Sequence, residues 1–127
     1  MRLQRDQSGQ VLVMLLAFMA TAIILTTSAV AVVIANMQAG TKQIKGEKAL
    51  QVAESGADNA LMRLLRDPSY AGETLTIADG TATITLSGSP TVTIVSKGQV
   101  GDFRRTIQVT AARLNNTLVV SSWKEVP

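Results

Sequence analysis

The sequence predicts an α+β protein in which a long N-terminal helix packs on a small antiparallel β-sheet. Residues 11–35 carry neither a charge nor a proline, and apolar side chains then recur at helical spacing to residue 66. From residue 73 the apolar pattern changes to period two, which indicates strands. The 127 residues are therefore expected to divide into a short leader (1–9), a transmembrane helix (10–35), an amphipathic stalk helix (36–67) and an antiparallel β domain (68–127).

The composition excludes several classes of function. The chain has no histidine and no cysteine, so neither a disulfide framework nor a His- or Cys-based metal site can form. No histidine is present to act as the base that activates a serine, and the carboxylates are scattered along the sequence. Basic residues are spread along the chain rather than clustered into a stripe, which disfavours nucleic-acid binding. We expect no enzymatic activity, no metal, no cofactor and no small-molecule substrate.

The apolar run Val11–Ala35 would form a helix of about 37 Å, long enough to cross a bilayer with some tilt. Arg2 and Arg5 precede the run, so the positive-inside rule places the leader in the cytoplasm and the later residues outside. The side chains expected to meet lipid or similar helices include Val11, Leu12, Leu15, Leu16, Ile23, Ile24 and Leu25. The mildly polar residues within the run, Thr21, Thr26, Thr27 and Ser28, are expected to hydrogen-bond to the preceding helical turn.

Three interpretations of this N-terminal region compete. A secretory signal peptide would be cut near Ala29–Ala31, but the apolar run continues beyond that point without a turn-forming residue. An uncleaved single-pass anchor needs no processing. A leader cut on the cytoplasmic side between Gly9 and Gln10 would leave the apolar helix in the mature protein, and a short polar leader that ends in glycine directly before the run fits this interpretation.

The stalk helix is predicted to end at Asp67-Pro68, because the residue before a proline disfavours the helical conformation. Its apolar stripe comprises Ile44, Leu50, Ala53, Ala57, Ala60, Leu61, Leu64 and Leu65. The residues expected to pack between stalk and sheet are Leu50, Ala53, Glu54, Ala57, Leu61 and Leu64. Glu54 is expected either to be solvated or paired with Lys48 or Arg63, or to bridge to the distal domain or to an adjacent subunit.

Alternating apolar residues predict four strands over Thr74–Ile77, Thr81–Leu86, Thr91–Val100 and Phe103–Leu114, and a short edge strand over Leu118–Trp123. Gly-containing turns separate the first four strands. One face of each of these strands is apolar, and this face is expected to lie on the stalk stripe. Trp123 is expected to act as a packing anchor.

Two stretches of the sequence resemble a known family. Gln7-Ser8-Gly9-Gln10-Val11-Leu12-Val13 is similar to the processing site and helix start of type IV pilin-like proteins. Ala49-Leu50-Gln51-Val52-Ala53-Glu54-Ser55-Gly56-Ala57 is similar to the Ala-rich stalk motif of PilX-type minor pilins and of the tip pseudopilins of type II secretion. The resemblance covers about the first 66 residues, and the remainder matches only as a generic antiparallel sheet.

This resemblance implies a structural or initiating subunit of a type IV pilus or of a type II secretion-like filament. A prepilin peptidase would cleave between Gly9 and Gln10 and the new terminus would be N-methylated. The expected partners are other pilins or pseudopilins through the N-terminal helix, the inner-membrane assembly platform and membrane lipid. Major pilins carry Glu at the fifth mature position, where this chain has Met14, which favours a minor subunit. The alternative is a single-pass anchored extracellular binding module that does not polymerise.

Overall fold

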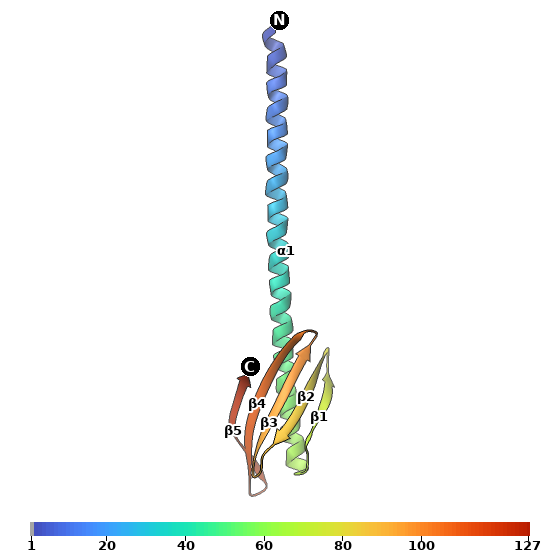
Figure 1. Ribbon diagram of the computed structural model, residues 1–127, viewed down its shortest axis with the longest axis vertical. Coiled ribbons are helices and arrows are strands. Elements are labelled where there is room, and N and C mark those ends of the chain that lie inside the picture. Colours follow the sequence, from blue (N-terminus) through green and yellow to red (C-terminus); the bar gives the residue numbers. More distant parts are fainter. Residues whose placement is uncertain (1) are drawn as a thin grey trace. The chain divides into compact units, whose positions relative to one another are not determined.

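The computed structural model describes residues 2–127, with side chains from residue 7 onward, and this part of the chain forms one helix and a five-stranded sheet (Figure 1). The elements are α1 (Arg2–Arg66), β1 (Gly72–Ile77), β2 (Gly80–Ser87), β3 (Thr91–Val100), β4 (Phe103–Leu114) and β5 (Thr117–Val126). The predicted α+β fold is therefore confirmed. The chain divides into two compact units, one that ends at Thr41 and one that spans residues 42–127.

Helix α1 begins at Arg2, earlier than the expected start at Gln10. Met1 lies outside the described residues. The difference has a simple cause: Arg2–Ser8 contains neither proline nor glycine, so nothing in this stretch breaks the helix. The other end agrees with the sequence, since α1 stops at Arg66, directly before Asp67-Pro68.

A turn closes the C-terminal end of α1. The Asp67 carboxylate accepts hydrogen bonds from the Ser69 hydroxyl (2.5 Å) and from the Ser69 backbone N–H (2.9 Å). These two hydrogen bonds stabilise the charged carboxylate and lower the pKa of Asp67, the hydroxyl having the larger effect. The Asp67-Pro68 pair therefore both ends the helix and turns the chain toward β1.

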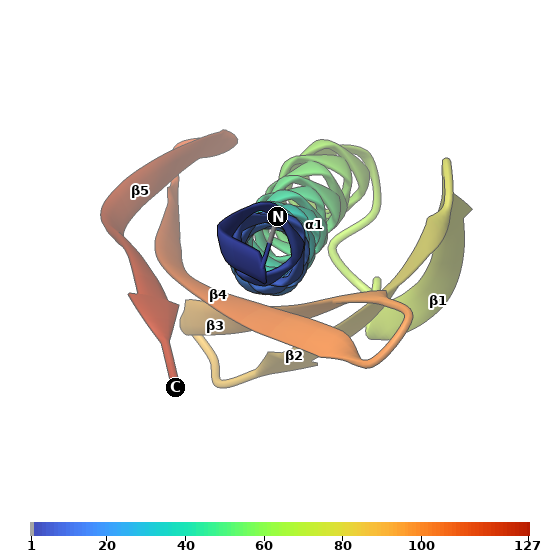
Figure 2. The ribbon, with the colours of Figure 1, turned by 90° about the horizontal axis from the view of Figure 1, so that it is seen from above.

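Each strand pairs antiparallel with its neighbour in the sequence, in the order β1-β2-β3-β4-β5. Strands β3 and β4 have the predicted bounds, and β1 and β2 extend the predicted ranges by one or two residues. Strand β5 is longer than the predicted Leu118–Trp123 because its pairing with β4 continues to Thr106↔Val126. Viewed from above, the sheet curves around the green part of α1, residues 42–66, which belongs to the same unit (Figure 2).

The core of the β domain lies between this part of α1 and the inner face of the sheet. The helix contributes mainly small buried residues, Ala49, Ala53, Ala57 and Ala60, together with Val52 and Leu64. The sheet contributes mainly Ile84, Ile94, Ile107 and Val109, each at most 2% exposed. The apolar face predicted for the strands is therefore the face that contacts α1. Because few side chains of the helix are large, the two backbones can approach closely.

Two glycines mark the closest approach between helix and sheet. A Cβ atom at Gly98 of β3 would overlap the Ala49 carbonyl oxygen and lie 2.5 Å from the Ala53 nitrogen. A Cβ atom at Gly56 of α1 would overlap the Ser96 hydroxyl oxygen and lie 2.8 Å from the Ala82 Cβ. Ser96 is fully buried, and its hydroxyl has no hydrogen-bond partner among the described residues. These positions thus require glycine for space.

Two members of the predicted stalk stripe do not belong to the core. Ile44 is 57% exposed and Leu65 is 50% exposed, whereas Ala49, Val52 and Gly56 are buried in their place. At 100° per residue, Ile44 lies on the opposite side of the helix from Ala53. The buried face is therefore centred on the small residues rather than on the large apolar ones.

We predict that Gly98→Ala destabilises the β domain. The new methyl group would meet helix backbone that cannot move without shifting the core, so the free energy of unfolding should fall by about 1–3 kcal/mol. Gly46→Ala is the matched control, because a Cβ there finds only the Arg105 Nη2 at 3.8 Å. This control should leave stability unchanged or raise it by up to about 1 kcal/mol. Thermal unfolding of the full chain in detergent measures both variants, and equal effects would contradict the close-approach interpretation.

Candidate functional site

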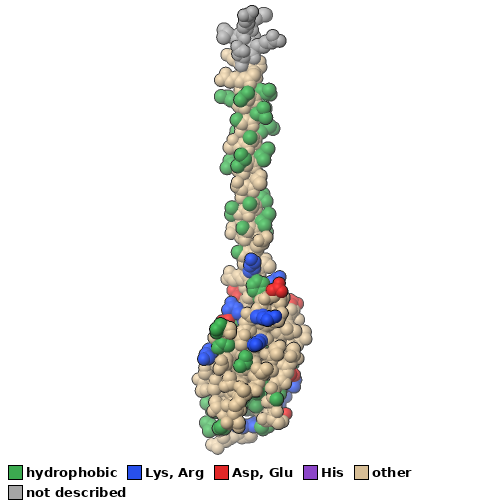
Figure 3. Space-filling view, viewed as in Figure 1, with side chains coloured by type: hydrophobic (Ala, Val, Ile, Leu, Met, Phe, Trp, Pro, Cys, Tyr) green, Lys and Arg blue, Asp and Glu red, His purple; other side chains and the backbone are tan. Residues whose placement is uncertain are grey.

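The side chains of the apolar segment Val11–Ala35 are exposed in the described chain. Its predicted contact residues are Val11, Leu12, Leu15, Leu16, Ile23, Ile24 and Leu25, and their exposed fractions lie between 54% and 66%. By length and composition α1 can cross a membrane, and its most apolar stretch is 0% buried. Figure 3 shows green side chains and no charged ones along this part of the visible face. A soluble core helix would instead be covered by its own chain.

The polar residues of the segment are satisfied within the helix. The hydroxyls of Thr21, Thr26, Thr27 and Ser28 each donate to the carbonyl oxygen four residues earlier, at 2.6–2.8 Å. The predicted back-bonding is therefore confirmed. Because the donors are used internally, these residues add little cost to burial of the helix in an apolar environment.

The proposed processing residues Gly9 and Gln10 lie within α1, and both are exposed. A Cβ atom at Gly9 would meet nothing within 4 Å, so packing within the described chain does not demand glycine there. Met14, the fifth residue counted from Gln10, is 65% exposed. The apolar run therefore has a methionine, and not a carboxylate, at the fifth residue counted from Gln10.

Most of the predicted stalk residues contact the sheet. Ala53 and Ala57 are fully buried, Leu64 is 5% exposed, and Leu50 and Leu61 pack on the same cluster. Glu54 is different, because its side chain is exposed and does not pack against the sheet.

The expected ion-pair partners of Glu54 bind elsewhere. Lys48 Nζ lies 3.5 Å from Asp79, and Arg63 Nε lies 2.8 Å from Glu73. Within the Ala-rich motif, Ala53, Gly56 and Ala57 therefore serve packing, whereas Glu54 and Ser55 face outward.

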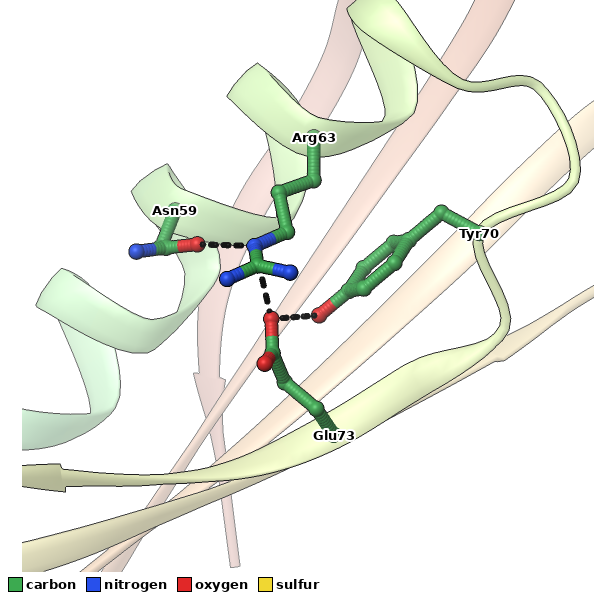
Figure 4. A network of polar contacts seen from close by, with 4 residues as sticks. All are labelled: Asn59, Arg63, Tyr70 and Glu73. Atoms are coloured by element: carbon green, nitrogen blue, oxygen red, sulfur yellow. Dashed lines mark hydrogen bonds and ion pairs between the residues drawn. The ribbon is translucent and has the colours of Figure 1, made fainter.

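A polar network joins α1 to the start of β1 (Figure 4). Arg63 Nε donates to the Asn59 amide oxygen at 3.2 Å and pairs with the Glu73 carboxylate. The Tyr70 hydroxyl donates to the same Glu73 oxygen at 3.0 Å, and the Arg63 guanidinium carbon lies 5.9 Å from the centre of the Tyr70 ring. The network connects the helix, the loop and the first strand. No local sequence pattern predicts this network, because its residues meet only after the chain turns at Asp67.

The C-terminal end of α1 is also bonded by a strand residue. Arg113 of β4 donates from Nη2 to the carbonyl oxygens of Leu65 (2.9 Å) and Leu64 (3.4 Å). Carbonyl groups at a helix C-terminus lack hydrogen-bond partners within the helix. A cation there also interacts favourably with the negative end of the helix dipole. Arg113 thus fixes the end of the helix against the sheet.

Among the described side chains, no group of three or more His, Cys, Asp or Glu residues is placed to hold a metal ion. Trp123 lies opposite the buried Val109 in the β4–β5 pairing, yet it remains 40% exposed. What the geometry offers is surface: an uncovered apolar helix in one unit and an open-edged sheet in the other.

Comparisons with known protein families, with curated proteins and with solved structures find no match to this chain.

We predict that Tyr70 titrates abnormally and that Glu73 contributes to the shift. Burial raises the pKa of Tyr70 to about 12, and the hydrogen bond to Glu73 and its negative charge act in the same direction. Tyr70 is the only tyrosine, so tyrosinate absorbance against pH reports it alone. Glu73→Gln should lower this pKa, but not fully to the ordinary value of 10.0, because burial remains.

The sign of the pH dependence follows from the raised pKa. The unfolded chain ionises its tyrosine near pH 10.0, before the folded protein does, so the contribution to stability is complete below that pH. It is lost as the pH rises toward about 12. The reference is the same protein in denaturant. An identical titration midpoint in the folded and unfolded protein would show that the network does not hold Tyr70.

Proposed function

We propose that this protein is a minor pilin or pseudopilin, a non-enzymatic structural or initiating subunit of a type IV pilus or of a type II secretion-like filament. The observation that carries the proposal is the apolar segment Val11–Ala35, whose side chains have no cover within the described chain. This segment and the stalk belong to one helix, α1, and the stalk carries a small β domain. A subunit that is stored in a membrane and then assembled needs both parts.

The energetics of the apolar segment require a partner outside the chain. Burial of one Leu or Ile side chain is worth roughly 1.5–3 kcal/mol, and the segment exposes many of them. Lipid satisfies this requirement while the subunit is in the membrane. Similar helices from other subunits would satisfy it in a filament. One surface thus serves both states, which is why the same residues are proposed to contact lipid and neighbouring pilins.

The N-terminal residues support processing and a minor role. Gly9 ends a short polar stretch directly before the apolar run, and the described structure gives it no packing reason to be glycine. Met14 avoids the cost of a carboxylate in lipid, several kcal/mol unless the charge is paired. An abundant subunit that needs that carboxylate for pairing is therefore a poorer fit than a minor or initiating one.

The proposed location is the cytoplasmic membrane, with the β domain outside and with entry into an extracellular filament. Arg2 and Arg5 flank one end of the apolar run, whereas Lys42, Lys45 and Lys48 flank the other. Since the two flanks carry comparable positive charge, the proposed orientation follows from cytoplasmic processing at Gly9 rather than from the charge bias that Arg2 and Arg5 alone suggest. Protease added to intact spheroplasts should digest the β domain if it lies outside.

The first test of the proposal is processing. In cells with an active prepilin peptidase, the intact mass of membrane-extracted protein should show the loss of Met1–Gly9 and the gain of one methyl group on Gln10. A peptidase-deficient strain is the control and should yield the longer chain. Recovery of the unprocessed chain from both strains would favour the plain anchored binding module.

The second test is assembly. Leu16→Asp places a carboxylate in the apolar segment, at a cost of about 2.5–3.5 kcal/mol at the membrane centre, and should reduce the protein in the membrane and in sheared filaments. Thr83→Asp introduces the same group at an exposed position of β2 and should leave both amounts unchanged. Immunoblots of the two fractions measure the effect. Wild-type protein that stays in the membrane, while filaments form normally without it, would overturn the minor-pilin proposal.

A further inference from the structure

One end of the β domain gathers exposed basic side chains from several elements. Lys97 and Arg104 stand near the β3–β4 turn, where Gln99 pairs with Arg104. Lys124 of β5 pairs with Gln108 of β4 near the same end of the sheet. Helix α1 meets this end at Gly46, where an added Cβ would lie 3.8 Å from the Arg105 Nη2. The next helical turn toward the N-terminus carries Lys42 and Lys45.

We name these five residues, Lys42, Lys45, Lys97, Arg104 and Lys124, the basic end; all five side chains are exposed. Figure 3 shows several blue side chains, with red ones between them, at one end of the β domain.

The basic end retains a positive charge because its members lack ion-pair partners among the described side chains. Two nearby cations are neutralised, Lys48 by Asp79 and Arg105 by Glu125. The remaining acidic residues there, Glu47 and Asp102, are exposed and fewer than the free cations. Lys97 and Arg104 also line one shallow depression, together with Arg105 and with Glu125, whose carboxylate pairs with Arg105.

We propose that the basic end binds the headgroup phosphates of anionic lipids at the bilayer surface. The inference rests on the membrane anchoring argued under Proposed function. Lys42 follows Ala35 by seven residues, about 10 Å of helix, which is about one Debye length at physiological salt. Lys42 therefore lies within reach of the headgroups, the sheet cations come within reach when the β domain lies on the lipid surface, and an arginine fork such as that of Arg104 suits phosphate oxygens.

The contact has a consequence for the stored subunit. While the apolar segment is in the bilayer, the basic end holds the β domain against the lipid surface. The attraction depends on charge, so salt or a membrane without anionic lipid releases the domain. The anchor itself does not depend on lipid charge, because apolar burial drives it.

The experiment uses the full chain reconstituted into vesicles. Because the chain has no cysteine, Thr106→Cys provides a single site for an environment-sensitive fluorophore beside Lys97 and Arg104. Vesicles of phosphatidylcholine alone are compared with vesicles that also contain phosphatidylglycerol. Fluorescence should show exclusion of water in the anionic vesicles only, and about 0.5 M NaCl, with a Debye length of roughly 4 Å, should reverse it. Co-flotation with the neutral vesicles reports the anchor separately.

Two substitutions complete the design in the labelled chain. Arg104→Gln should lower the ratio of docked to undocked protein about fivefold in anionic vesicles, the effect expected of one cation at a membrane surface. Arg66→Gln is the matched control, because Arg66 is also exposed but lies at the opposite end of the stalk, and it should have no effect. Equal fluorescence in the two vesicle types, or equal effects of the two variants, would overturn the inference while leaving the anchor intact. Failure to float with either vesicle type would overturn the anchor and the inference together.

Discussion

The close approach between α1 and the middle of the sheet is the contact on which the rest of the β domain depends. Gly98 lies against the helix backbone at Ala49 and Ala53, and Gly56 lies against Ser96. Because the surfaces are nearly in backbone contact, medium-sized side chains such as Ile94 and Val109 fill the centre of the core, and the aromatic residues Tyr70 and Phe103 pack only against its partly exposed edges. This close approach has a cost in stability. It requires a small side chain at Ser96, and the buried Ser96 hydroxyl has no hydrogen-bond partner among the described residues.

The sequence predicted the strands well because period-two patterns and Gly-containing turns are local signals. It predicted the centre of the helical face less well. Hydrophobic periodicity placed Ile44 and Leu65 in the packed stripe, although both are exposed. It left out Ala49 and Gly56, although both are buried. Small residues carry a weak hydrophobic signal, yet here their size decides which face packs. The membership of the interface therefore depends on the fold and not on the helix pattern alone.

The parts of the candidate site differ in the same way. The apolar segment was visible in the sequence, because absence of charge over a long stretch needs no tertiary information. The basic end was not, since Lys97, Arg104 and Lys124 come together only through strand pairing and its register. Arg63 likewise reaches Glu73 rather than Glu54 because the chain turns after Asp67 and brings β1 beside the helix. Contacts across a turn were the least predictable feature of this chain.

The nearest-neighbour order of the sheet has a consequence for how the domain acquires its structure. Every strand pairs with the strand before or after it in the chain, so each pairing needs only the closure of a short loop. Such local connectivity favours rapid formation. The helix, however, is synthesised first and finds its principal contacts on β2, β3 and β4. During synthesis, the Ala-rich face of α1 therefore has no sheet to cover it until the chain has been made to about Val109. In that interval the face is accessible to other proteins.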